Sequence, residues 1–98
     1  SLPAHPGATL LMRFIRTDHR LVEHLSIWSI SDVNLEDAAS FYRQAAMDKQ
    51  FTPSRQLADT PDVIETRYHR DGRALTVRCR QAGSEVRVVL QLRYTVAD

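Results

Sequence analysis

Only one segment of the sequence has the periodicity of an α-helix, and it spans residues 34–49. Asn34 is a favourable N-cap, and Glu36 and Asp37 place negative charge where the helix dipole favours it. Pro53 makes continuation of the helix unfavourable. Apolar residues recur at the spacing of one buried helical face: Leu35, Ala38, Ala39, Phe41, Tyr42, Ala45 and Ala46. A lone helix of this kind needs a sheet to cover its apolar face.

The remainder of the chain has the pattern of β-strands separated by turns. Asp71-Gly72 is the strongest turn signal, typical of a type I′ hairpin, and the next turn is centred on Ala82-Gly83 or Gly83-Ser84. The polar segment 51–61 is bounded by prolines, and we predict a loop there. Strands are predicted at about residues 8–16, 21–31, 63–70, 73–81 and 85–96.

Hairpin geometry predicts which side chains share a face of the sheet. A turn centred on Asp18-His19 puts Arg16 opposite Leu21 and Met12 opposite Leu25. One face of this hairpin then holds Leu10, Met12, Phe14, Leu25 and Ile27, and the other holds Leu11, Ile15, Val22, His24 and Trp28. The Asp71-Gly72 turn sets three further pairs: Ile64 with Cys79, Thr66 with Val77, and Tyr68 with Leu75.

These elements predict an α+β fold with the order β-β-α-β-β-β. We expect a single five-stranded antiparallel sheet with strand order 2-1-5-4-3 and one helix packed on one face. The last strand is placed centrally, beside the first, because the last is the longest and the first is apolar on both faces. Residues 8–98 form this one domain, and residues 1–7, rich in proline, form a flexible N-terminal arm.

An apolar patch is the first candidate for a functional site. Leu11, Ile15, Val22 and Trp28 are predicted on the face away from the helix, where an exposed apolar patch marks a protein partner or a dimer interface. The alternative is that segment 51–61 or the arm folds over these side chains and hides them.

A basic sheet face is the second candidate site, for anions. The predicted outer face carries Arg67, Arg78, Arg80, Arg87 and Arg93. Basic sheet faces receive phosphates, but RNA-binding sheets also need exposed aromatic rings, and this face has none. The net charge of the chain is only +1. A solvated face with cross-strand pairs such as Glu65–Arg78 is therefore the simpler interpretation, and we do not expect nucleic acid to be the partner.

The sequence has no motif typical of an enzyme. Cys79 is predicted on the inward face as a buried, inert thiol, and the four histidines are scattered without metal-ligand spacing. No nucleophile–base pair or glycine-rich phosphate loop is present. We therefore predict a non-enzymatic protein with no metal and no cofactor. A small-molecule pocket between helix and sheet is a third possibility for function.

Three short motifs occur in an order that resembles small exported or lipid-anchored bacterial domains of unassigned function. They are Pro6-Gly7-Ala8 before the first strand, Phe41-Tyr42-Arg43 in the helix, and Asp71-Gly72-Arg73 opening a later strand. A Gly-Trp often ends the helix in that pattern, whereas this chain has Gln50-Phe51. The resemblance implies a cell-envelope location and a non-catalytic role, and it supplies no functional residues.

Together these features predict a non-enzymatic interaction domain of the bacterial cell envelope. It would bind a protein partner or itself through the outer sheet face, and the alternative is a nucleic-acid or anionic-ligand module that uses the arginine-rich face. The chain does not start with Met, so we interpret it as a processed product or a fragment. We expect a periplasmic or envelope-anchored location, with membrane contact only through an N-terminal anchor absent from this sequence; a cytoplasmic location is the alternative.

Overall fold

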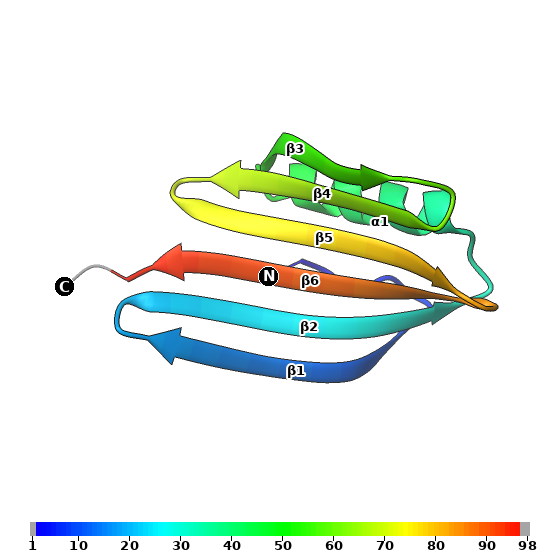
Figure 1. The fold of residues 1–98 in the computed structure, drawn as a ribbon, viewed down its shortest axis with the longest axis horizontal. Helices are drawn as coiled ribbons and strands as arrows, with labels where there is room; N and C mark the ends of the chain where they lie inside the picture. The colour runs from blue at the N-terminus through cyan, green and yellow to red at the C-terminus, as the bar shows by residue number, and fades with distance from the viewer. Residues whose placement is uncertain (1, 97–98) are drawn as a thin grey trace.

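The computed structural model describes residues 2–96, which form a six-stranded antiparallel sheet and one helix (Figure 1). The elements in chain order are β1 (Ala8–Asp18), β2 (Leu21–Ser31), α1 (Leu35–Asp48), β3 (Thr52–Asp59), β4 (Val63–Arg70), β5 (Arg73–Ala82) and β6 (Glu85–Thr95). The α+β class with an antiparallel sheet is therefore confirmed, whereas the predicted number of five strands is wrong.

The helix forms where the sequence predicts it. The backbone N–H of Asp37 donates to Asn34 Oδ1 at 2.8 Å, which is the expected N-cap hydrogen bond. Six residues of α1 are buried, and all belong to the predicted apolar face: Leu35, Ala38, Ala39, Tyr42, Ala45 and Ala46. Phe41 is half-buried beside them.

Segment 51–61, predicted as a loop, contains the strand that the sequence analysis missed. Phe51 is buried, and its N–H donates to the Ala46 carbonyl at 3.0 Å, so the chain turns directly from the helix into β3. β3 lies at an edge of the sheet, and most of its residues are exposed. Such a strand buries neither face fully, and it shows no apolar alternation for a sequence pattern to detect.

The strand order is β1-β2-β6-β5-β4-β3, so the predicted placement of the last strand beside the first is also wrong. Consecutive elements run in alternating directions in Figure 1. Omitting β3 from this alternation reverses the deduced direction of every later strand. With β3 included, β6 is antiparallel to β2, and the two strands pair along their full length from Leu21–Thr95 to Ser31–Glu85.

The two later turns are confirmed, and the first is displaced. Asp71 and Gly72 both have positive φ, 48° and 75°, and the pairs predicted from this turn are all present. The next turn is centred on Gly83-Ser84, one of the two predicted positions. The first turn is instead centred on His19-Arg20, because Asp18 pairs with Leu21.

The displaced first turn changes the cross-strand pairs of its hairpin. Met12 lies opposite Ile27 rather than Leu25, and Arg16 lies opposite Glu23 rather than Leu21. The shift moves each partner by two positions, so the residues grouped on one face stay together except at a bulge between Leu10 and Met12.

The helix covers only part of the sheet. It packs on β4 and β5, on the face where Leu75, Val77, Val86 and Val88 are buried, and we call this the helix-bearing face. The opposite face, which no helix covers, is called the open face (Figure 1). Cys79 is fully buried in the core, as predicted.

The N-terminal arm lies against the helix. The His5 ring contacts the Phe41 ring edge-to-face with 4.9 Å between centroids, and the His5 N–H donates to the Tyr42 hydroxyl at 3.5 Å. Leu2 packs against the core cluster. The arm therefore contributes side chains to the helix-bearing side of the domain.

Candidate functional site

Strand β1 is the most exposed regular element of the described chain. Ala8 is half-buried, and every other residue of β1 is exposed. Ile15 retains 61% and Phe14 42% of its accessible surface. The large apolar side chains exposed on this strand are Leu10, Leu11, Met12, Phe14 and Ile15. A run of this kind on a sheet edge is a common binding surface for another polypeptide.

The predicted partner-binding residues do not share one face. Ile15, Val22 and Trp28 alternate onto the helix-bearing face, since Trp28 pairs with the buried Val88 and packs against the core. Leu11 is the extra residue at the bulge in β1 and is exposed. The prediction that these side chains point away from the helix is therefore wrong for Ile15, Val22 and Trp28.

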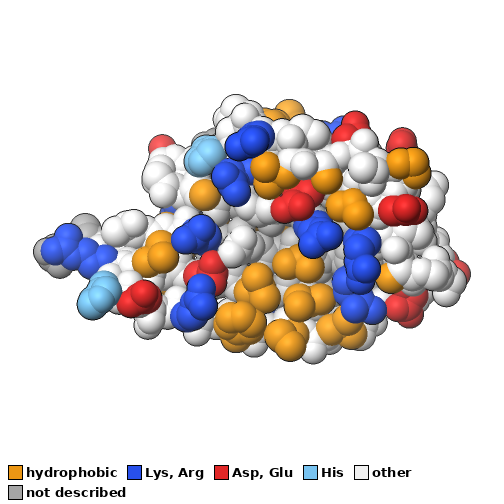
Figure 2. Space-filling model, in the orientation of Figure 1, with side chains coloured by type: hydrophobic (Ala, Val, Ile, Leu, Met, Phe, Trp, Pro, Cys, Tyr) orange, Lys and Arg blue, Asp and Glu red, His pale blue; other side chains and the backbone are white. Residues whose placement is uncertain are grey.

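The apolar surface of the open face is formed mainly by residues of the hairpin group that was predicted to lie on the helix-covered face. Met12 and Phe14 of β1 pair with Ile27 and Leu25 of β2, and Val89 of β6 pairs with Ile27. Figure 2 shows hydrophobic side chains gathered on this side of the molecule. The predicted alternation had placed four of these five residues, Met12, Phe14, Leu25 and Ile27, together on one face. The sequence contains no signal that shows which of the two faces the helix covers.

A buried carboxylate lies beside this apolar surface. Glu23 is only 7% exposed, and its oxygens accept hydrogen bonds from Arg16 Nη2 at 2.9 Å and Gln91 Nε2 at 2.6 Å. Arg93 Nε lies 3.5 Å from the same carboxylate. This network joins β1, β2 and β6 on the open face and holds the apolar surface on a rigid base.

All five arginines of the predicted anion site lie on the open face, as the strand register requires. Two of them have acidic partners, because Arg93 lies beside Glu23 and Arg78 Nε lies 3.8 Å from Glu65 Oε1. The predicted Glu65–Arg78 pair is thus confirmed. Of the remaining three, Arg80 and Arg87 lie directly opposite each other, and Arg67 pairs with Thr76 and Arg55. The arrangement is a partly neutralised basic face.

The two edges of the sheet are built differently. β3 contains Pro53, which has no N–H to donate, and two register shifts in its pairing with β4. Bulges, prolines and polar residues are the devices that prevent an edge from accepting another strand. β1 has a single bulge near its start and then pairs regularly from Met12 to Asp18, with apolar side chains on both faces. Of the two edges, β1 is the one suited to strand addition.

Comparisons with known proteins add no functional assignment. No family model, no curated protein and no solved structure matches this chain. Across residues 2–96, no helix is long and apolar enough to cross a membrane. The same residues contain no cluster of three or more side chains suited to hold a metal ion.

Proposed function

We propose that this chain is a non-enzymatic interaction domain that binds another polypeptide by strand addition at β1. The supporting observation is the contrast between the two edges of one sheet. β3 is interrupted by Pro53 and by two register shifts, while β1 presents a regular edge with exposed apolar side chains. The resemblance noted in the sequence is the reason for placing this role in the bacterial cell envelope.

Strand addition would satisfy two physical needs of β1. An edge strand has backbone N–H and C=O groups that have no partner strand, and an added strand would pair them. It would also shield Met12 and Phe14 on the open face and Ile15 on the helix-bearing face. Full burial of a large apolar side chain contributes roughly 1.5–3 kcal/mol, and these half-exposed side chains would gain part of that.

A second copy of this chain is the partner that we propose. Antiparallel pairing of two β1 strands about a two-fold axis makes the same surface face itself, as in most homodimers. A register centred on Phe14 would place the two Phe14 rings side by side and set Met12 opposite Arg16 of the other copy. Arg13 would then face Ile15, so no two arginines would lie opposite each other. The strand is self-complementary in this register.

Sedimentation velocity on serial dilution tests this proposal. The wild-type chain is expected to form a dimer that dissociates on dilution, and Met12→Lys with Phe14→Lys should make it monomeric. A matched control adds two lysines to the other edge, at Thr52 and Asp59 of β3, and should leave the dimer intact. Hydrogen exchange of the β1 amides should slow at concentrations where the dimer forms.

Two outcomes would contradict the proposal. A dimer that survives the β1 substitutions would place the interface elsewhere. A wild-type chain that stays monomeric at all concentrations would exclude the second copy and leave β1 for a different protein chain, which a pull-down with immobilised wild-type and β1-substituted domains would compare.

A second candidate function is anion binding at Arg80 and Arg87. Arg87 Nε is buried and has no hydrogen-bond partner among the residues described, and the facing Arg80 concentrates positive charge there. Binding of single-stranded RNA to this face would be electrostatic, with affinity that falls steeply with salt and shows no sequence preference. Tight binding that persists at high salt would contradict this purely electrostatic expectation and would favour anion binding over strand addition as the function of the domain.

A further inference from the structure

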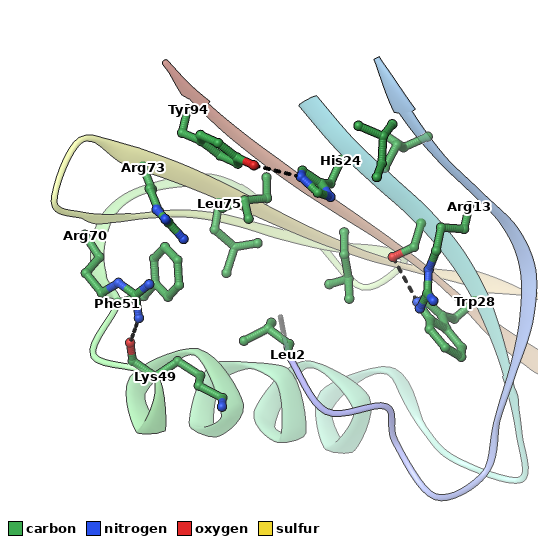
Figure 3. A pocket seen from close by; sticks show the side chains of 15 residues that line it. Leu2, Arg13, His24, Trp28, Lys49, Phe51, Arg70, Arg73, Leu75 and Tyr94 are labelled. Carbon is green, nitrogen blue, oxygen red and sulfur yellow. Dashed lines mark hydrogen bonds between the residues drawn. The ribbon is translucent and has the colours of Figure 1, made fainter. Parts of the chain in front are cut away.

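A groove lies on the helix-bearing side, where the helix leaves β1, β2 and β6 uncovered (Figure 3). Its volume is about 400 Å³, within the range of sites that bind small molecules. Leu75, Leu90 and Leu92 from the two central strands β5 and β6 line its interior, and Trp28 and Phe51 contribute aromatic walls. The surface inside the groove is therefore mainly apolar.

The charged residues around this groove are all basic. Arg13, Lys49, Arg70 and Arg73 line it, and no aspartate or glutamate among residues 2–96 does. Within the part of the chain that the structure describes, none of the four forms a salt bridge with a carboxylate. The open face differs, because Arg78 and Arg93 there have acidic partners. The groove thus combines an apolar interior with uncompensated positive charge.

Three of these cations are held in place by aromatic rings. The guanidinium carbon of Arg70 lies 4.7 Å from the centroid of the Phe51 ring. Arg73 lies 5.0 Å from the Tyr94 ring, and Arg13 lies 5.6 Å from the Trp28 ring. A guanidinium over a ring is attracted by the ring face and keeps N–H groups able to donate at the rim. These donors are preorganised for an anion.

Three of the cations gather at one end of the groove. Lys49 is the C-cap residue of α1, and Arg70 and Arg73 flank the β4–β5 turn (Figure 3). Arg70 Nη1 donates to the Lys49 carbonyl at 2.6 Å. This hydrogen bond offsets the negative end of the helix dipole, which would otherwise repel an anion there. Arg13 lies at the Trp28 side, across the apolar interior.

We propose that this groove binds an anionic amphiphile, a molecule with one carboxylate or phosphate head group on an apolar chain. The head group would bind Lys49, Arg70 and Arg73. The apolar chain of the ligand would lie along Leu75, Leu90 and Leu92 toward Trp28. Leu2 of the N-terminal arm also lines the groove and would cover part of the bound chain.

This site adjoins the proposed strand addition, because Arg13 and Ile15 of β1 line the groove. Its head-group end, formed by Lys49, Arg70 and Arg73, lies away from the β1 edge. The protein carries its own reporter, because Trp28 is the sole tryptophan of the chain and lines the groove. Dodecanoate and dodecyl phosphate, each kept below its micelle concentration, are expected to change Trp28 fluorescence in a saturable manner. Isothermal titration calorimetry provides a second readout.

Head-group and chain controls identify the chemistry. Dodecanol and dodecyltrimethylammonium lack the negative charge and should bind at least about tenfold more weakly, since charge-assisted hydrogen bonds are among the strongest that a site can offer. Acetate and inorganic phosphate lack the chain and should not compete. Equal affinity for the charged and neutral amphiphiles, or for phosphate alone, would overturn the proposal.

A pair of matched variants locates the site. Arg70→Gln with Arg73→Gln should reduce affinity for dodecanoate by about tenfold or more. Arg55→Gln with Arg67→Gln removes the same charge from the open face, outside the Arg80–Arg87 pair, and should leave affinity unchanged. Thermal melts show whether the Arg70 and Arg73 variant is folded. If it is not, Lys49→Gln, a substitution at an exposed residue, replaces it in the test. Unchanged binding by a folded groove variant would overturn the assignment.

Discussion

Arg80 lies directly opposite Arg87 in the β5–β6 ladder. Like charges at opposed positions destabilise a sheet, and opposite charges there contribute roughly 0.2–1 kcal/mol. We therefore expect Arg80→Gln to stabilise the domain slightly and Arg80→Glu to stabilise it more, by up to about 1 kcal/mol, as measured by urea denaturation. An Arg80→Glu variant that is no more stable than Arg80→Gln would show that the two side chains do not interact.

Burial of Cys79 predicts a loss of stability in alkaline solution. Desolvation raises the pKa of this thiol from its ordinary value of 9.0 to about 12. Only the unfolded state releases the proton between these values, so stability is complete below about pH 9 and falls by at most about 1.4 kcal/mol per pH unit above it. Burial also raises the pKa values of Tyr42 and Tyr68, which adds to the loss at higher pH.

A Cys79→Ala variant isolates the thiol contribution. Its free energy of unfolding should fall less steeply than that of the wild type between about pH 9 and pH 10, where the thiol is the main group concerned. Parallel pH profiles for the two proteins would contradict the assignment. The native thiol should also be unreactive toward a disulfide reagent at pH 8, whereas the urea-unfolded chain reacts.

The Asp71-Gly72 turn should tolerate some side chains at Gly72 and not others. Gly72 has a φ of 75°, and a Cβ added there would meet no atom within 4 Å, so the penalty of substitution is backbone strain alone. Gly72→Val should lose about 1–2 kcal/mol because an L-residue is strained in this region. Gly72→Asn should lose less, since asparagine adopts positive φ more readily. Equal losses of stability in the Gly72→Val and Gly72→Asn variants would exclude the type I′ geometry.

The two adjacent aromatic residues of α1 should differ in their contribution to stability. Tyr42 is fully buried in the core, and Phe41 is half-buried under the N-terminal arm. Tyr42→Ala should lose about 3–5 kcal/mol, the range for a large buried aromatic side chain. Phe41→Ala should lose clearly less in the same denaturant titration. The reverse order would mean that the arm buries Phe41 more completely than the structure indicates.

The elements predicted correctly from sequence are those with strong local signals. The helix combines an N-cap at Asn34 with a complete apolar face, and Asp71-Gly72 identifies its hairpin without ambiguity. β3 has no comparable signal, because it is polar and exposed along most of its length. Because β3 was left out, the deduced directions of the later strands were reversed. The last strand was therefore placed beside β1, whereas it lies beside β2. One undetected strand thus accounts for the incorrect order.

The sites depend on information that local patterns do not carry. Alternation grouped Ile15 with Trp28 and Phe14 with Leu25 correctly, but both groups are apolar, and only the packed helix decides which one is covered. The groove was no more than a general possibility at the sequence level. Its cations come from β1, the helix end, β4 and β5, and no spacing rule links positions so far apart.

The unequal edges of the sheet also set a limit on assembly. A chain with two receptive edges can pair with a neighbour on each side, and repeated pairing of that kind produces an open fibre. In this domain Pro53 and two register shifts interrupt the β3 edge, while β1, whose pairing is regular from Met12 to Asp18, is the edge proposed to accept a partner. Two copies joined at β1 would present only β3 edges to solution. Growth would therefore stop at two subunits, which permits self-association without a route to aggregation.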